Sequence, residues 1–198
     1  MAEHLRTFIV LLLLAIPTFA IAKTPACALA TSVKDFERRR NVWFAITCVA
    51  FLAHDFWIFI AVTAILLFFV APAEPNKIAL YFVLLFAAPM VAADIGGLGI
   101  INSLFGINYV RLLTLLILFP AYLSLRRQSG VIPFGKLLPD KLIAGYIILN
   151  IILMWPIMSA TATFRQGVFY AFVDIFLPYY VASRSLKNLA DFKDALMA

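Results

Sequence analysis

Charged residues are scarce in this chain of 198 residues, where Asp, Glu, Lys and Arg together make up 13%. A soluble domain carries about 25% charged and about 45–50% apolar residues, whereas this chain is 65% hydrophobic with a mean hydropathy of +1.02. This composition excludes a soluble enzyme, a disordered tail and a nucleic-acid-binding module. We therefore expect an integral membrane protein that contacts membrane lipids and has no nucleic-acid partner.

Cysteine and histidine are also scarce, with two residues of each. Cys27 and Cys48 stand among apolar residues, and neither belongs to a CxxC pair or a His/Cys cluster. Such cysteines are usually small buried hydrophobic residues. We expect neither a metal site nor a cofactor.

The apolar residues are gathered in runs between charges and turn residues. A membrane-spanning helix needs about 20 residues to cross a hydrocarbon core of about 30 Å, and no run alternates as the strands of an outer-membrane barrel do. The predicted fold is all-α: a polytopic transmembrane helical bundle with six or seven membrane segments, forming a single domain over 1–198. The runs lie at 7–22, 42–53, 56–71, 78–93, 109–125, 142–159 and 166–183.

Two regions leave an alternative open. One helix over 41–71 would be roughly 46 Å long and would place His54 and Asp55 near the bilayer centre, where charge is costly. A hairpin broken at Ala53–Asp55 avoids that cost, and we favour it. At the N-terminus, Arg6, an apolar run and Ala20–Ala22 are also typical of a cleaved signal peptide. We favour a retained first helix.

Basic residues predict the orientation. Segments 23–41, 72–77, 126–141 and 184–198 carry thirteen of the sixteen Lys and Arg residues. Short loops rich in Lys and Arg stay in the cytoplasm. The hairpin places all four segments on that side, with Arg6, Arg111 and Arg165 on the other. We expect a multi-pass protein of the bacterial inner membrane with a cytoplasmic C-terminus.

Asp174 is the one acidic residue within the apolar run 166–183. A carboxylate inside the membrane is a functional candidate. Pro178 follows four residues later, and a proline both lacks an N–H and pushes on the carbonyl four residues before it. Asp174 is therefore either a functional group or part of a packing kink, paired to a residue on a neighbouring helix.

Three further positions are candidates on the outer side. Arg111 and Arg165 each stand at the end of a predicted span, where an arginine either binds a phosphate with two hydrogen bonds or anchors the helix end. His54 and Asp55 form an adjacent imidazole–carboxylate pair, which suits acid–base chemistry or a polar turn that caps two helices. We treat Arg111 and Arg165 as candidate phosphate ligands.

Two segments complete the prediction. Gly96–Gly99 lacks the spacing of a phosphate loop and is predicted to be a turn that re-enters the membrane interface at Ile100–Ile107. Residues 184–198 place most apolar side chains on one side, which predicts an amphipathic cytoplasmic helix at the membrane surface. The chain has no terminator after this helix, so we expect the N-terminal part of a longer protein.

Three stretches resemble the N-terminal half of bacterial O-antigen ligase/polymerase-type membrane proteins. They are Phe51–Phe59 (FLAHDFWIF), Leu98–Leu125 and Phe164–Ala195. The last is the most specific, with Asp174-Ile-Phe-Leu-Pro-Tyr-Tyr followed by Ser183-Arg-Ser-Leu. The resemblance covers roughly residues 40–198.

The resemblance implies a glycosyltransferase that acts on glycans linked to undecaprenyl pyrophosphate at the outer face of the membrane. It implies no catalytic residue here, because the long outer loop that carries the family's essential Arg and His has no counterpart, and the fragment alone is expected to be inactive. The alternative from a different class is a transporter or channel-like subunit without covalent chemistry, with Asp174 as an ion or proton site. The residues carry no signal for an oligomeric state.

Overall fold

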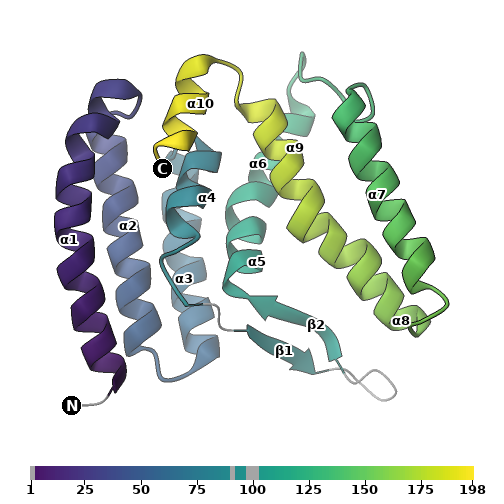
Figure 1. Ribbon diagram of the computed structural model, residues 1–198, viewed down its shortest axis with the longest axis horizontal. Coiled ribbons are helices and arrows are strands. Elements are labelled where there is room, and N and C mark those ends of the chain that lie inside the picture. The colour runs from purple at the N-terminus through teal and green to yellow at the C-terminus, as the bar shows by residue number, and fades with distance from the viewer. Residues whose placement is uncertain (1–2, 90–91, 97–102) are drawn as a thin grey trace. The chain divides into compact units, whose positions relative to one another are not determined.

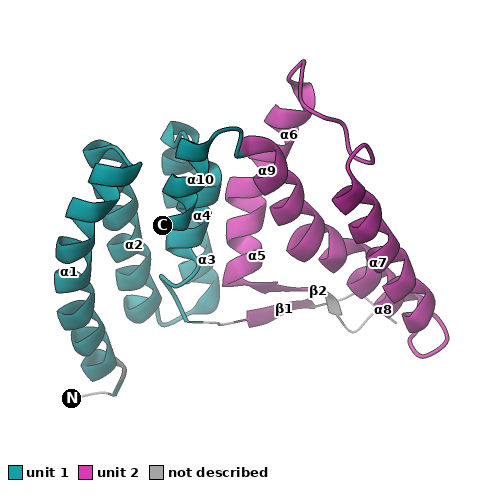
Figure 2. Ribbon diagram, turned by 45° about the horizontal axis from the view of Figure 1, so that its top comes forward, with its two compact units in different colours: residues 1–91, 186–198 teal, residues 92–185 magenta. Residues whose placement is uncertain are grey.

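The computed structural model describes residues 3–89, 92–96 and 103–198. Its contacts group the chain into two compact units, one of residues 1–91 with 186–198 and one of residues 92–185 (Figure 2). The sequence shows no linker between them, and we had expected a single domain over the whole chain. Each unit is therefore described by itself.

The first unit begins with two adjacent helices, α1 (Glu3–Leu29) and α2 (Val33–Leu52) (Figure 1). Ser32 caps α2, because its side chain accepts a hydrogen bond from the Asp35 N–H at 3.1 Å. The predicted loop over 23–41 is therefore largely helical. Three of its basic residues, Lys23, Arg38 and Arg39, pair with carboxylates, and this pairing outweighs the signal of a polar loop.

The break predicted at Ala53–Asp55 is confirmed. Helix α2 ends at Leu52, and α3 runs over Phe56–Val70. One Asp55 carboxylate oxygen accepts hydrogen bonds from the backbone N–H groups of Trp57 at 2.7 Å and Ile58 at 3.2 Å. Capping the first turn in this way fixes where α3 begins. The hairpin is accordingly the observed form of 41–71.

The rest of the first unit consists of two short helices. Helix α4 covers Lys77–Leu84, about half of the predicted run 78–93, of which residues 90–91 lie outside the described part. The C-terminal segment is not one helix over 184–198. The preceding helix ends at Ser185, and α10 begins only at Leu189, where Asn188 caps it by accepting from the Asp191 N–H.

The chain is mostly helical, as predicted, and the second unit adds a short antiparallel hairpin that the all-α prediction did not include. Strand β1 (Ala92–Gly96) pairs with β2 (Ser103–Asn108), with Ala92 opposite Asn108 and an irregularity between Ile95 and Gly96. The strands satisfy each other's backbone polar groups, which a membrane interface favours over an irregular loop. The predicted re-entrant turn falls partly on residues 97–102, outside the described residues.

Long helices form the remainder of the second unit. One runs over Tyr109–Arg127, as α5 (Tyr109–Leu113), a π-helical turn (Thr114–Leu118) and α6 (Phe119–Arg127). Helix α7 covers Leu138–Met154. The last runs over 160–185, as α8 (Ala160–Thr163), a π-helical segment (Phe164–Phe176) and α9 (Leu177–Ser185). Figure 1 shows α7 alongside this last helix.

Both π-helical segments end just before a proline. One residue separates the first from Pro120 and the second from Pro178. A proline removes an N–H and crowds the carbonyl four residues back, and a wider turn relieves that crowding. The Leu177 N–H accordingly donates to the Phe172 carbonyl, five residues back. The distortion predicted around Pro178 takes the form of a change in helical register.

Among the described residues, three helices are long and apolar enough to cross a membrane: Leu5–Leu29, Phe56–Ala73 and Tyr109–Arg127. The six or seven segments predicted from the sequence are not confirmed. Large apolar side chains lie exposed on these helices, including Leu13 and Phe69, which are 66% and 73% exposed. Surfaces of this kind suit contact with membrane lipids.

Candidate functional site

Arg111 stands in the first turn of the helix Tyr109–Arg127. Asn108 precedes the helix and caps it, because its side-chain oxygen accepts from the Arg111 N–H at 2.8 Å. The cap fixes the direction in which the Arg111 side chain leaves the backbone. The arginine is therefore held at one end of a span-length helix, as the sequence predicts.

Arg111 and Asp174 form an ion pair between two helices. The Arg111 Nε lies 3.1 Å from each Asp174 oxygen, and Nη2 lies 2.8 Å from Oδ2. The two residues are 63 positions apart in the chain. Of the two alternatives for Asp174, the structure contains the pairing with a neighbouring helix, with Arg111 as the partner. The Asp174 side chain remains 37% exposed, and that of Arg111 is 17% exposed.

Tyr170 completes this cluster. It lies four residues before Asp174, and the Arg111 Cζ sits 3.5 Å from the centre of its ring, which adds a cation–π contact. The Tyr170 hydroxyl accepts from the Gly106 N–H at 2.7 Å, and Arg111 Nη1 donates to the Gly106 carbonyl at 2.7 Å. Strand β2 is therefore fastened to both helices. Sequence reasoning missed Tyr170 and Gly106.

The polar groups around Gly106 converge closely. A Cβ atom placed on Gly106 would lie 2.8 Å from Asp94 Oδ1, 3.4 Å from the Tyr170 hydroxyl and 3.7 Å from Arg111 Nη1. A guanidinium, a phenol and a carboxylate thus surround one point on the hairpin. Together with Asp174, they can donate and accept hydrogen bonds to a polar ligand at the end of the spans.

Arg165 lies in a helix rather than in a loop between the predicted runs 142–159 and 166–183. Ser159 caps α8, accepting from the Ala162 N–H at 3.3 Å, and the helix continues through Arg165 to Ser185. Polar residues there read as a loop in the sequence, but the Ser159 cap starts a helix instead. Arg165 and Asp174 consequently belong to the same helix, and Arg165 is half-buried.

A small cavity of about 150 Å³ opens beside Asp174. Its lining includes the polar side chains of Asn150, Gln166 and Tyr170, contributed by α7 and the π-helical segment. Its wall is mainly apolar with several polar groups, as in binding sites, but its volume is below the about 300–1,000 Å³ of small-molecule pockets. The cavity adjoins the candidate site through Asp174 and Tyr170.

Gly167 lets α7 approach the π-helical segment beside this cavity. A Cβ atom at Gly167 would meet Ile151 Cγ1 at 2.7 Å. We expect Gly167→Ala to lower the free energy of unfolding by about 1–3 kcal/mol, since the added methyl forces the helices apart. Thermal unfolding in detergent measures this effect. Ile151→Ala in the same chain should restore most of the loss, and an additive double variant would contradict this close contact.

His54 and Asp55 belong to the first unit. The Asp55 carboxylate caps α3, and His54 Nδ1 lies 3.1 Å from the Leu52 carbonyl oxygen. Both side chains are exposed. These contacts are those of a polar turn that caps a helix, which is one of the two interpretations of this pair.

A buried ion network in the first unit was not predicted. Arg39 donates to Glu74 from Nε and Nη2, at 3.0 and 2.6 Å, and to Asp194 from Nη1 and Nη2, at 2.8 Å each. Arg38 and Asn76 add hydrogen bonds to the same carboxylates. Burial would raise the pKa of Asp194, but the bonds from Arg39 and Thr31 outweigh it and lower the pKa. The network joins α2, the segment Glu74–Asn76 that leads into α4, and α10.

A second unpredicted network lies at the start of α7. Arg184 Nη2 donates to both Asp140 oxygens, at 2.8 and 2.7 Å, and the Tyr179 hydroxyl donates to Oδ1 at 2.6 Å. Burial would raise the pKa of Asp140, but these bonds, with those from the Leu137 and Gly135 N–H groups, hold it at about 2. The only sequence signal for Asp140 was its place in the first turn after Pro139.

The described residues contain no group of three His, Cys, Asp or Glu side chains that could hold a metal ion. Comparison of the chain with known protein families, with curated proteins and with solved structures finds no match. The fold and its exposed apolar helices define the class of the protein as a helical membrane protein.

Proposed function

We propose that the protein containing this chain is an inner-membrane glycan ligase or polymerase. It would act on polysaccharide linked to undecaprenyl pyrophosphate at the periplasmic face, with the C-terminus of this chain in the cytoplasm. One observation carries the proposal: Arg111 and Asp174 join two of the three stretches that resemble this family. The stretch with the most specific pattern therefore contacts a second stretch of the resemblance through Asp174.

The chemistry of such a transfer suits the cluster at this site. A glycan that leaves a pyrophosphate needs cationic groups to stabilise the phosphate charge. Arg111 donates from Nη1 to Gly106 and from Nε and Nη2 to Asp174, and it also bonds to Tyr170. A phosphate oxygen would share these N–H groups with the present acceptors or displace one of them. Asp174 and Tyr170 hold the guanidinium in place and act as positioning residues.

The charge balance also involves Arg165. Asp174 neutralises much of the Arg111 charge, which weakens the attraction of Arg111 for an anion. Arg165, on the same helix as Asp174, adds a second positive charge, and with Asp94 beside Gly106 the two arginines and two aspartates balance. We therefore assign pyrophosphate binding to directed hydrogen bonds from Arg111 and Arg165 rather than to a net positive charge.

Glycan transfer by the protein that contains this chain tests the proposal. We expect Arg111→Ala and Arg165→Ala each to reduce transfer by about 10- to 100-fold, since a charge-assisted contact contributes about 1.5–3 kcal/mol. Arg111→Lys should restore transfer only in part, because lysine lacks the two-pronged geometry. Arg126→Ala, at the other end of the same helix and exposed, is the matched control.

The double variant separates positioning from direct binding. If Asp174 acts through Arg111, adding Asp174→Asn to Arg111→Ala should reduce transfer little further, while Asp174→Asn alone should raise KM for the lipid-linked glycan. Protein abundance is measured for each variant. Near-normal transfer at normal abundance in both arginine variants would leave them as helix anchors and remove them from the site.

A second candidate function rests on the exposure of Asp174. Its side chain is 37% exposed and lines the small cavity with Asn150 and Gln166, as an ion or proton site of a transporter subunit does. In that case Asp174→Asn would abolish coupled uptake of a solute, and purified protein would leave lipid-linked glycan unchanged.

A further inference from the structure

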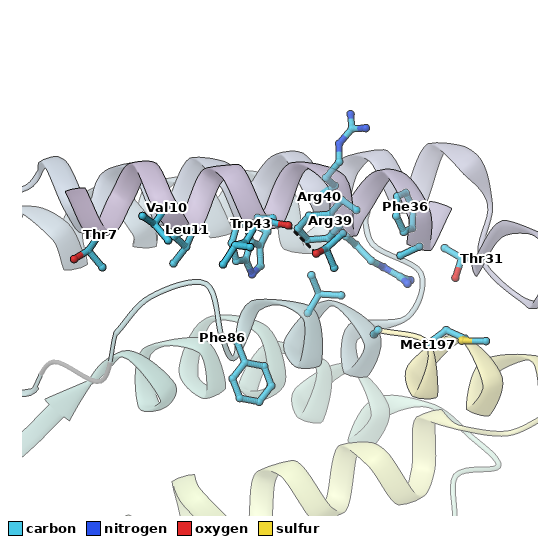
Figure 3. Close-up of a pocket in the computed structure, with 17 residues that line it drawn as sticks. Thr7, Val10, Leu11, Thr31, Phe36, Arg39, Arg40, Trp43, Phe86 and Met197 are labelled. Carbon is cyan, nitrogen blue, oxygen red and sulfur yellow. Dashed lines mark hydrogen bonds between the residues drawn. The ribbon is translucent and has the colours of Figure 1, made fainter. Parts of the chain in front are cut away.

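The first unit contains a groove of about 590 Å³ along α1 (Figure 3). Helix α1 forms one wall, from Thr7 to Ala22, and α2, the region of Phe86 and the C-terminal residues Met197 and Ala198 form the others. Trp43 and Phe86 approach it from different elements in Figure 3. The volume is within the range of about 300–1,000 Å³ typical of small-molecule sites.

The groove is apolar and follows a membrane-length helix. Leu11, Leu14 and Phe19 line it on α1, within the candidate span Leu5–Leu29. The distance along α1 from Thr7 to Ala22 is roughly 22 Å, which exceeds the ~15 Å of hydrocarbon in one leaflet. A space of this kind is unfavourable for water, which needs several polar partners. An acyl chain matches this apolar chemistry, and the groove is long enough to hold the whole chain.

One end of the groove is basic. Arg39 and Arg40 both line it, but they differ in their partners. Arg39 is buried between Glu74 and Asp194, so its charge is neutralised. Arg40 donates from Nε and Nη2 to the neutral Asn41 side-chain oxygen, at 3.1 and 2.9 Å. Figure 3 shows its guanidinium extending outward, away from Phe86.

We propose that this groove binds an anionic phospholipid of the surrounding bilayer, with one acyl chain along α1 and the phosphate at Arg40. A basic group at the end of an apolar space between membrane helices is the arrangement that recognises anionic lipid headgroups. Arg40 supplies the charge, and Arg39 fixes the end of α2 without contacting the lipid. The lipid fills the space that α1 leaves beside α2.

Fluorescence quenching of Trp43 tests this proposal. Trp43 lines the groove and is only 9% exposed, so bulk lipid reaches it poorly. The exposed Trp57 and Trp155 are replaced by phenylalanine, which leaves Trp43 as the sole tryptophan. The protein is placed in phosphatidylcholine vesicles that contain a minor fraction of chain-brominated phosphatidylglycerol or of chain-brominated phosphatidylcholine. Bromine quenches tryptophan on contact.

We expect brominated phosphatidylglycerol to occupy the groove about fivefold more readily than brominated phosphatidylcholine. This ratio corresponds to the attraction of about 1 kcal/mol between one basic group and an anionic lipid surface. Arg40→Gln should remove this preference, and Arg126→Gln, an exposed arginine that does not line the groove, should keep it. Ala15→Phe, which fills the groove, should reduce quenching by both lipids.

Three results would overturn the proposal. Equal quenching by the two lipids would mean that the groove does not prefer an anionic headgroup. A preference that survives Arg40→Gln would remove Arg40 from the site. The absence of quenching by either lipid would mean that protein, such as another helix or a second copy, fills the groove.

Discussion

Replacing Arg39 with alanine is expected to lower the free energy of unfolding by about 3–5 kcal/mol, the largest effect of any single change in the first unit. The Arg39 side chain is 5% exposed, and that of Glu74 is 0% exposed. Removing the guanidinium leaves two carboxylates in a poorly solvated site, where Arg38 still donates to Glu74 and Asn76 and Thr31 still donate to Asp194. Thermal unfolding in detergent measures the loss.

Two comparisons separate this network from a general effect of charge. Arg40→Ala removes a neighbouring arginine that contacts only Asn41 among the bonds described, and should change stability by less than about 0.5 kcal/mol. Arg39→Lys should recover only part of the loss. The planar guanidinium makes paired hydrogen bonds to two carboxylates, and the smaller ammonium of lysine cannot reproduce that geometry. Hydrogen exchange of α10 should rise in Arg39→Ala, since Asp194 then loses its main partner. Unchanged exchange would mean that α10 is held by its apolar contacts alone.

Asp140→Asn is expected to have an effect of similar size, about 3–5 kcal/mol, because it leaves the buried Arg184 without a counter-charge. The effect depends on pH in a defined direction. The pKa of Asp140 is about 2 in the folded protein, below the ~3.9 of an unfolded chain. The contribution of ionised Asp140 to the free energy of unfolding is therefore fully present above about pH 4 and is lost as the pH falls through about 2.

The stability difference between the native chain and Asp140→Asn, followed from pH 7 downward, measures this contribution. It should stay constant to about pH 4 and then shrink. Tyr179→Phe removes one hydrogen bond and keeps the ion pair, so a loss of only about 1 kcal/mol is expected there. A difference that narrows already between pH 7 and pH 5 would contradict the ion pair with Arg184 as the cause.

The elements that the sequence predicts well are those set by long apolar runs. The run 56–71 corresponds to α3, and 109–125 to the helix Tyr109–Arg127. The break at Ala53–Asp55 was also predictable, because a buried His54–Asp55 pair is costly and Asp is a strong helix cap. In each case the deciding interaction is local or is with the bilayer.

The elements that the sequence predicts poorly depend on distant partners. Residues 33–41 are rich in charge and read as a loop, yet they are helical where Arg39 meets Glu74, 35 residues away. Strands β1 and β2 were read as a loop because their pairing and their attachment to Tyr170 are not local. A lone Asp174 in an apolar run signals that a partner exists, but nothing local identifies Arg111.

The measurement that tests the proposed function most directly is glycan transfer by the purified protein that contains this chain, in vesicles loaded with undecaprenyl-pyrophosphate-linked glycan. Transfer breaks the bond between glycan and pyrophosphate, so the account predicts that undecaprenyl pyrophosphate is released as glycan is transferred or lengthened. It also predicts that Arg111→Ala slows both changes by about 10- to 100-fold. Lipid-linked glycan that remains intact with the native protein, at normal folding and abundance, would contradict the account.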